Sequence, residues 1–97
     1  MAFSFSNKQI ADLLRNVAAV YQIKNKNQFQ IRAYDLAADS IEHSTSDIKT
    51  LWEEGQLDGV PGLGDKIRGY LDELFREGKV RHFEEAFVGI HKSIFEF

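Results

Sequence analysis

The apolar positions of this chain recur at three- and four-residue steps, which is the spacing of one face of an α-helix. A first helix is predicted to begin near Ser6 or Asn7, because Ser6 and Gln9 match a capping box, with Ser6 as the cap, ahead of the apolar positions. Those positions are Ile10, Leu13, Leu14, Val17 and Tyr21. The polar run from Lys24 to Asn27 then predicts a break, with Asn25 or Asn27 as the cap of the next helix.

Four more helical segments follow this break. The apolar positions of the second segment are Phe29, Ala33, Tyr34, Ala37, Ala38 and Ile41. Those of the fourth segment are Ile67, Leu71, Leu74 and Phe75, and those of the fifth are Phe83, Phe87, Ile90 and Ile94. The alanines of the second segment predict close approach to a neighbouring helix. A short third helix is predicted to end near Gly55, with Thr45 or Ser46 as its cap, and Gly78 is placed to end the fourth. Since no segment shows sustained strand alternation, we expect an all-α fold, a compact bundle of four to five helices.

Length and composition restrict the classes of protein that remain. The 97 residues, of which 43% are hydrophobic, are enough for one small core, so residues 1–97 are expected to form a single domain. The chain has no cysteine, which excludes disulfides and thiolate metal sites. The histidines lack metal-ligand spacing. Because we find neither a signal-peptide pattern nor a membrane-spanning apolar run, we expect a cytoplasmic monomer that does not bind membranes.

The charge distribution is uneven. A net charge of -3 argues against binding nucleic acid by bulk attraction. Residues 1–34 nevertheless hold five basic residues against Asp12 alone, and residues 66–82 hold five against three acidic ones. The stretch between them is acidic, so local positive patches are possible on an acidic protein.

The stretch VPGLGDKI, residues 60–67, offers the clearest candidate site. It could be no more than a tight turn between helices, since glycine adopts backbone angles closed to other residues and proline stiffens the entry. Alternatively, Leu63 anchors the loop in the core while Gly62 and Gly64 leave backbone N–H groups bare. These groups precede a helix amino terminus, which favours anions, and Lys66 adds a full positive charge. Such a site would grip phosphate without reading base sequence.

These residues resemble a known family. The stretch, followed by a helix and EGKV, is similar to the helix-hairpin-helix DNA-binding motif. Residues 7 to 85 resemble the amino-terminal domain of family X DNA polymerases, of the DNA polymerase beta-like type. The strongest elements are F-x-x-R-A-Y-x-x-A-A at residues 29–38 and P-G-L-G-x-K-I at residues 61–67. The resemblance implies one helix-hairpin-helix motif within the all-α bundle. It also implies that the chain is the N-terminal part of a longer polymerase, because HKSIFEF leads into a second hairpin motif in longer members.

The resemblance implies a DNA-repair role at the downstream, 5′-phosphate side of a gap or at a junction of single- and double-stranded DNA. The protein is then expected in the nucleus of a eukaryote or on the nucleoid of a prokaryote. The residues implied to bind DNA are Arg32, Tyr34, Gly62, Gly64, Lys66 and Arg68, with Tyr34 in the 5′-phosphate pocket. The backbone carbonyls of Asp58, Val60 and Leu63 would hold a monovalent cation, Na⁺ or K⁺; no other cofactor is expected.

The match fails at one position that carries chemistry. Some family members are 5′-deoxyribose phosphate lyases, whose lysine forms a Schiff base with the sugar aldehyde. Tyr70 occupies that position, and a phenol cannot form an imine, so we expect a domain that is not an enzyme when isolated. Lys66 is a weak substitute, because a solvated lysine is mostly protonated. A lyase using Lys66 and a protein-interaction scaffold that has lost DNA binding therefore remain the alternatives to a binding module.

Overall fold

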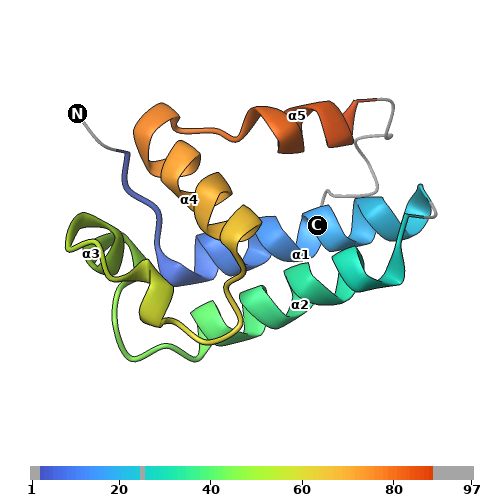
Figure 1. Cartoon of the computed structure of the whole chain (residues 1–97). Helices are drawn as coiled ribbons and strands as arrows, with labels where there is room; N and C mark the ends of the chain where they lie inside the picture. The colour runs from blue at the N-terminus through green and yellow to red at the C-terminus, as the bar shows by residue number, and fades with distance from the viewer. Residues whose placement is uncertain (1–2, 25, 89–97) are drawn as a thin grey trace.

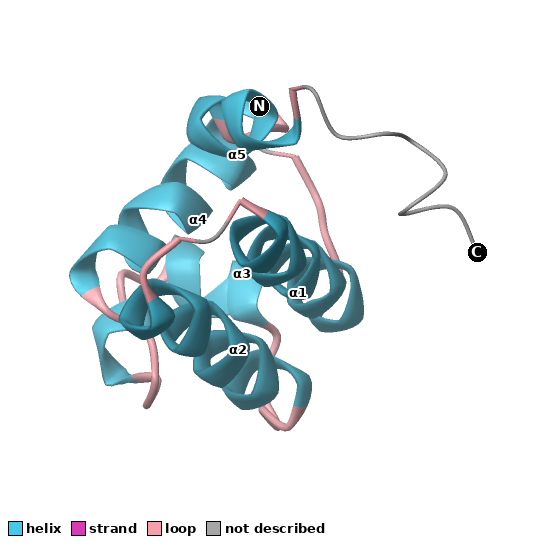
Figure 2. Ribbon diagram, turned by 90° about the vertical axis from the view of Figure 1, so that its right-hand side faces the viewer, coloured by secondary structure: helices cyan, strands magenta, loops and turns pink. Residues whose placement is uncertain are grey.

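A computed structural model describes residues 3–24 and 26–88, and all regular secondary structure in these ranges is helical (Figures 1 and 2). The elements are α1 (Asn7–Ile23), α2 (Gln28–Glu42), α3 (Ile48–Glu53), the 3₁₀ turn η1 (Leu57–Gly59), α4 (Asp65–Glu77) and α5 (Arg81–Phe87). The all-α prediction is confirmed. Ile90 and Ile94, predicted for the fifth helix, lie outside the described residues, as does the rest of HKSIFEF.

Helices α1 and α2 form an antiparallel pair, over which α4 and α5 lie (Figure 1). The predicted capping box is present, since Ser6 Oγ accepts from the Gln9 backbone N–H at 3.1 Å and Gln9 Oε1 accepts from the Ser6 N–H at 2.9 Å. Asn27 caps α2 through its Oδ1, which accepts from the Phe29 N–H at 2.7 Å. Arg15 of α1 then joins the pair by donating to Asp39 and Glu42 of α2, at 2.8 Å each. Local caps thus fix where the two helices begin, and two ion pairs from Arg15 join them at the surface.

The predicted cap of α3 was wrong. Asp47 occupies the N-cap position without a side-chain cap, and neither Thr45 nor Ser46 bonds the first turn. Instead, the Ile48 N–H donates to Asn7 Oδ1 at 2.9 Å, while Asn7 Nδ2 donates to the Ser46 carbonyl at 2.9 Å. The cap is therefore supplied by a residue some forty positions earlier in the sequence, which only the tertiary fold brings close.

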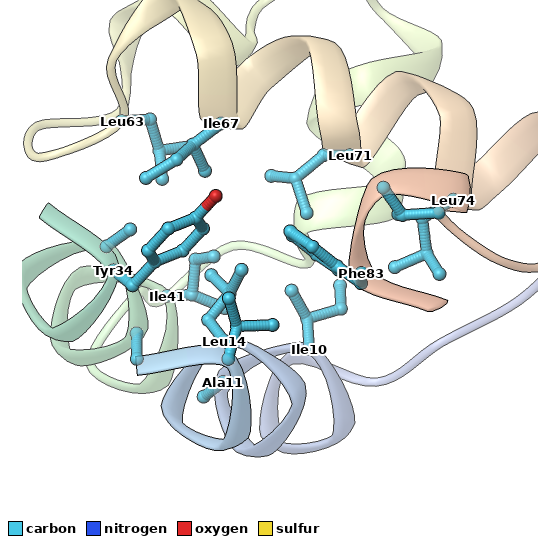
Figure 3. Packing of buried hydrophobic residues seen from close by; sticks show 14 of the residues in the cluster. Ile10, Ala11, Leu14, Tyr34, Ile41, Leu63, Ile67, Leu71, Leu74 and Phe83 are labelled. Atoms are coloured by element: carbon cyan, nitrogen blue, oxygen red, sulfur yellow. The ribbon is translucent and has the colours of Figure 1, made fainter. Parts of the chain in front are cut away.

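The core is one cluster drawn from every helix (Figure 3). Its labelled members lie between α1 below and α4 above, with Tyr34 from α2 and Phe83 from α5 inserted between them. The buried members are Ile10, Ala11, Leu14, Val17, Ala18, Tyr21, Ile31, Tyr34, Ala37, Ala38, Ile41, Ile48, Leu57, Leu63, Ile67, Leu71, Leu74, Phe75, Val80 and Phe83. Ala37 and Ala38 are fully buried on the side of α2 that faces the core. This agrees with the prediction that the alanines of this helix allow a neighbouring helix to approach closely. Phe29 and Ala33 of the same helix, in contrast, are exposed.

The turn after α4 was predicted correctly. Gly78 has φ +81°, a left-handed conformation that favours glycine, and its N–H donates to the Leu74 carbonyl at 2.8 Å. The chain then reverses into α5, whose Phe83 is buried against the core. This reversal brings His82 of α5 beside Tyr70 of α4, where their rings stack 5.2 Å apart.

The indole of Trp52 on α3 is fastened to α4. Its Nε1 donates to Asp72 Oδ1 at 2.8 Å, and its ring lies 5.1 Å from that of Phe75. The hydrogen bond from Trp52, helped by Arg76, holds the pKa of Asp72 below the ordinary value of 3.8. Because the folded-state pKa is lowered, this stabilisation is present above the ordinary aspartate pKa and is lost as the pH falls through the folded-state value.

We therefore expect the fluorescence of Trp52 to titrate in acid with a midpoint below pH 3.8. Trp52 is the only tryptophan in the chain, so the emission comes from this one indole, and Asp72→Asn tests whether the carboxylate causes its change. The measurement is an emission titration of the folded protein, and Asp72→Asn should remove the transition. A midpoint at or above the ordinary aspartate value would show that the bond from Trp52 does not favour the charged carboxylate.

Candidate nucleic-acid interface

The hairpin between α3 and α4 is held by one buried side chain. Leu63 packs into the core beneath the turn, close to Ile67 (Figure 3). Gly62 before it has φ +84°, and Gly64 after it takes the N-cap position of α4 in an extended conformation. The anchoring of the loop by Leu63, expected from the sequence, is therefore present, with Pro61, Gly62 and Gly64 on the exposed side.

A row of backbone N–H groups at this turn has no hydrogen-bond acceptor. Within residues 3–24 and 26–88, none is recorded for the nitrogens of Gly62, Gly64, Asp65, Lys66 and Ile67. The Leu63 N–H does have one, the Val60 carbonyl, at a long 3.4 Å. Gly64 supplies no side chain to cap α4, and a Cβ built there would meet nothing within 4 Å. The amino terminus of α4 thus offers several donors to an external anion, in the orientation that the helix dipole favours.

Gly62 is required by its backbone conformation. A Cβ built there would lie 2.6 Å from Ser40 Oγ and 3.4 Å from the Leu36 carbonyl oxygen. We expect Gly62→Ala to lower the free energy of unfolding by about 1–2 kcal/mol, because alanine strains the left-handed conformation. Chemical denaturation measures this loss. Gly59→Ala is the matched control, since Gly59 has no positive φ and no atom within 4 Å of a built Cβ. Equal losses in the two variants would contradict the prediction.

A pocket of about 220 Å³ opens beside the hairpin, between α1, α2, α4 and α5. Three phenols, one imidazole and two lysine amines contribute to its lining. Its lining residues are Tyr21, Lys26, Gln30, Ala33, Tyr34, Lys66, Ile67, Tyr70 and His82. Lys66 lines the pocket and also lies in the first turn of α4, next to the unbonded amides. The hairpin and the pocket are therefore adjacent parts of one surface.

Tyr34 forms the buried centre of this pocket, with 5% of its surface exposed. Its ring lies edge-on to that of Tyr21 at 5.3 Å and nearly parallel to that of Tyr70 at 6.5 Å. Burial, with a smaller effect from Tyr21 and Tyr70, raises the pKa of Tyr34 above its ordinary value. A tyrosine phenol is protonated at neutral pH even at its ordinary pKa, and the direction of this shift keeps it so. Tyr21 continues the network to α5, since its hydroxyl lies 2.6 Å from His82 Nε2.

The sequence-predicted DNA-binding residues do not all gather here. Gly62, Gly64, Lys66 and Tyr34 lie at the hairpin or the adjoining pocket. Arg32 is exposed on α2, outside the residues that line the pocket. Arg68 pairs with Asp65 and lines a groove on another face of α4.

Two pocket residues were missed by sequence reasoning. From the sequence, Lys26 is part of a polar break and of the basic first third, and His82 is one of the histidines that lack metal-ligand spacing. Both line the pocket with Lys66, although they come from segments far apart in the sequence. The basic bias of residues 1–34 and 66–82 was the available signal. It could not single out these two side chains, because charge counts do not specify which residues share a face.

The three carbonyls predicted to hold a monovalent cation accept few hydrogen bonds within the protein. Within the described part of the chain, no donor is recorded for the carbonyl oxygens of Asp58 and Leu63, and Val60 accepts only the long bond from Leu63. Carbonyl oxygens are ligands that hard cations prefer. Among the same residues, no group of three His, Asp or Glu side chains could hold a metal ion. None of the described helices has the length and hydropathy needed to cross a bilayer.

Two helices, α3 and α4, are joined by a short glycine-containing turn, and α4 begins with unbonded amides. This arrangement is that of the helix-hairpin-helix class. The comparison of sequences agrees with this assignment: the family model for the helix-hairpin-helix domain matches residues 5–80. The chain belongs to this family, whose domains generally bind DNA. No curated protein matches the chain significantly.

Proposed function

We propose that this domain binds DNA through phosphates, without sequence preference, at the amino terminus of α4. The observation that carries the proposal is the set of unbonded N–H groups at Gly62, Gly64 and Lys66. Neutral amides in a fixed turn can bind phosphate oxygens even though the chain carries a net charge of -3. The electrostatic repulsion between DNA and this acidic protein is reduced beside the hairpin, because Lys66 and Lys26 both line the adjoining pocket.

The pocket beside the hairpin is proposed to take the 5′-phosphate at a gap in the DNA. Lys26 and Lys66 supply positive charge, and the protonated phenol of Tyr34 supplies a donor. The resemblance to family X DNA polymerases suggested this use of Tyr34. The domain would then position the downstream side of a gap for repair synthesis by a catalytic domain elsewhere in a longer chain. Na⁺ or K⁺ held by the carbonyls of Asp58, Val60 and Leu63 would supply a positive charge near the phosphates.

An NMR titration tests both parts of this proposal. A gapped duplex should shift the amide resonances of Gly62, Gly64 and Lys66, and the observed binding constant should fall linearly on a logarithmic salt scale, because phosphate contacts release counterions. A 5′-phosphate on the downstream strand should additionally shift the side-chain resonances of Tyr34 and His82. An unchanged spectrum at low salt would refute DNA binding. Side-chain resonances of Tyr34 and His82 that are identical with and without the 5′-phosphate, beside shifted hairpin amides, would refute only the use of the pocket.

The lyase alternative depends on Lys66, the lysine shared by the hairpin and the pocket. Tyr70 lies one helical turn later and stacks on His82, which is a packing role that does not form an imine. Lys66 itself is exposed, whereas lysines that form Schiff bases are typically enclosed in apolar sites. The geometry therefore favours binding over lyase chemistry. Borohydride trapping on an abasic 5′ end separates them: the lyase predicts a covalent complex that Lys66→Ala abolishes, and the binding module predicts none.

A further inference from the structure

A second, larger surface feature lies on another side of α4. It is a shallow groove of about 800 Å³ between α3, the following loop and α4, which we call the α3–α4 groove. Its lining residues are Trp52, Glu53, Gly55, Leu57, Asp58, Asp65, Arg68, Gly69, Asp72 and Arg76. Helix α4 gives residues 66, 67 and 70 to the pocket and residues 65, 68, 69, 72 and 76 to this groove. The two surfaces therefore share no side chain, and both could be occupied at once.

Trp52 gives the groove a fixed aromatic element. Its Nε1 is bonded to Asp72, and its ring packs on Phe75, so its orientation is set before any partner arrives. Tryptophan is among the residues that contribute most to binding when an interface covers them. A pre-oriented indole also limits the entropy that is lost on binding.

Two glycines leave the backbone open along the groove. A Cβ built at Gly55 or at Gly69 would meet nothing within 4 Å. Gly69 lies inside α4 without a positive φ, where alanine would favour the helix by about 1 kcal/mol. The packing of the domain therefore gives no reason for glycine at this position. Close approach of another chain would be such a reason, since any side chain at position 69 would fill the groove.

The charges that line the groove favour a basic partner. Arg68 is paired with Asp65 and Arg76 with Asp72, so both arginines are neutralised within the domain. Glu53 and Asp58 also line the groove, and within residues 3–24 and 26–88 neither side chain has a recorded hydrogen-bond or ion-pair partner. The groove therefore presents uncompensated negative charge beside an aromatic ring. Phosphates would be repelled, whereas lysine or arginine side chains would be attracted.

We propose that the α3–α4 groove docks a short basic segment of a partner protein, in which an apolar side chain covers Trp52 and flanking lysines or arginines face Glu53 and Asp58. This interaction surface is independent of the DNA-binding proposal. A protein bound there leaves the Tyr34 pocket open, since the pocket and the groove share no lining residue. The domain would then be able to hold DNA on one face and a protein on another.

The test is a titration of the whole chain with the blocked heptapeptide Lys-Leu-Lys-Gly-Lys-Leu-Lys, followed by Trp52 emission. The expected result is a saturable change in emission. Gly69→Gln should weaken binding about tenfold or more, equivalent to about 1.4 kcal/mol, because its side chain occupies the groove. Its thermal midpoint should not fall, since glutamine favours a helix over glycine, and this separates a blocked groove from a damaged fold.

Matched variants test the electrostatic part. Glu53→Gln with Asp58→Asn should weaken peptide binding about three- to tenfold, as expected for two partly solvated charges. Asp12→Asn with Glu77→Gln removes the same charge outside the groove and should leave binding unchanged, and a peptide with glutamate in place of lysine should not bind. No response at about 1 mM peptide, a millimolar affinity, would overturn the proposal. So would equal affinity for Gly69→Gln, because a blocked groove must then not be the binding site.

Discussion

Gly64→Asp is expected to weaken DNA binding about 10- to 100-fold while leaving the domain folded. Aspartate is a good N-cap residue, so its carboxylate should accept from the N–H of Lys66 or Ile67, which is recorded without an acceptor in the native chain. The variant would then consume the donors that the phosphate needs and place a negative charge at the site. Loss of one or two charge-assisted hydrogen bonds, at about 1.5–3 kcal/mol each, accounts for the expected magnitude. Fluorescence anisotropy with a gapped duplex at fixed salt measures the affinity.

Because Gly64→Asp is expected to stay folded, a loss of DNA affinity in this variant would report on the phosphate site and not on unfolding. Gly64 has no positive φ and nothing within 4 Å of a built Cβ, so aspartate should fit without strain and raise the thermal midpoint slightly. Gln56→Glu adds the same charge at an exposed loop position away from these amides, and it should change affinity by less than about threefold. If Gly64→Asp binds DNA as well as the native domain does, the amino terminus of α4 is not the phosphate site.

Phe75→Ala is expected to lower the free energy of unfolding by about 3–5 kcal/mol, the usual cost of removing a buried aromatic ring. Phe75 is completely buried and contacts the rings of Phe5 and Trp52. Its loss would leave a cavity where the amino-terminal segment, α3 and α4 meet. For a domain of this size, each kcal/mol corresponds to about 4–8 °C in thermal midpoint, so the variant should melt at least 12 °C lower. Thermal unfolding followed by far-ultraviolet circular dichroism measures the shift.

Phe29→Ala is the matched control for this deletion. Phe29 is 81% exposed, so the same atoms are removed from water-accessible surface and no cavity forms. The expected change is within about 0.5 kcal/mol, as for other surface substitutions. A similar loss of stability in both variants would mean that burial of Phe75 is not what stabilises the junction of α3 and α4.

Local sequence signals located most of the helices. The capping box at Ser6, the cap at Asn27 and the stop at Gly78 depend on neighbours within about one helical turn. The sequence predicted the first and the last, and it narrowed the second to Asn25 or Asn27. The cap of α3 was not predicted, because its acceptor comes from Asn7. Periodicity also could not indicate that Phe29 would be exposed. A partner far along the chain leaves no trace in the spacing of its own segment.

Part of the candidate site was likewise predictable from local sequence, and part depended on how the helices pack. The turn VPGLG and the lysine after it point to a phosphate-binding amino terminus, since glycine, proline and helix polarity act over a few residues. The pocket beside it needed the packing of four helices to bring Lys26 and His82 together with Lys66. The α3–α4 groove likewise exists only because Trp52 meets Asp72 across two helices. Features of the backbone that depend on a few neighbouring residues can be predicted from the sequence. The set of side chains that share one surface cannot, because it depends on how the helices pack against one another.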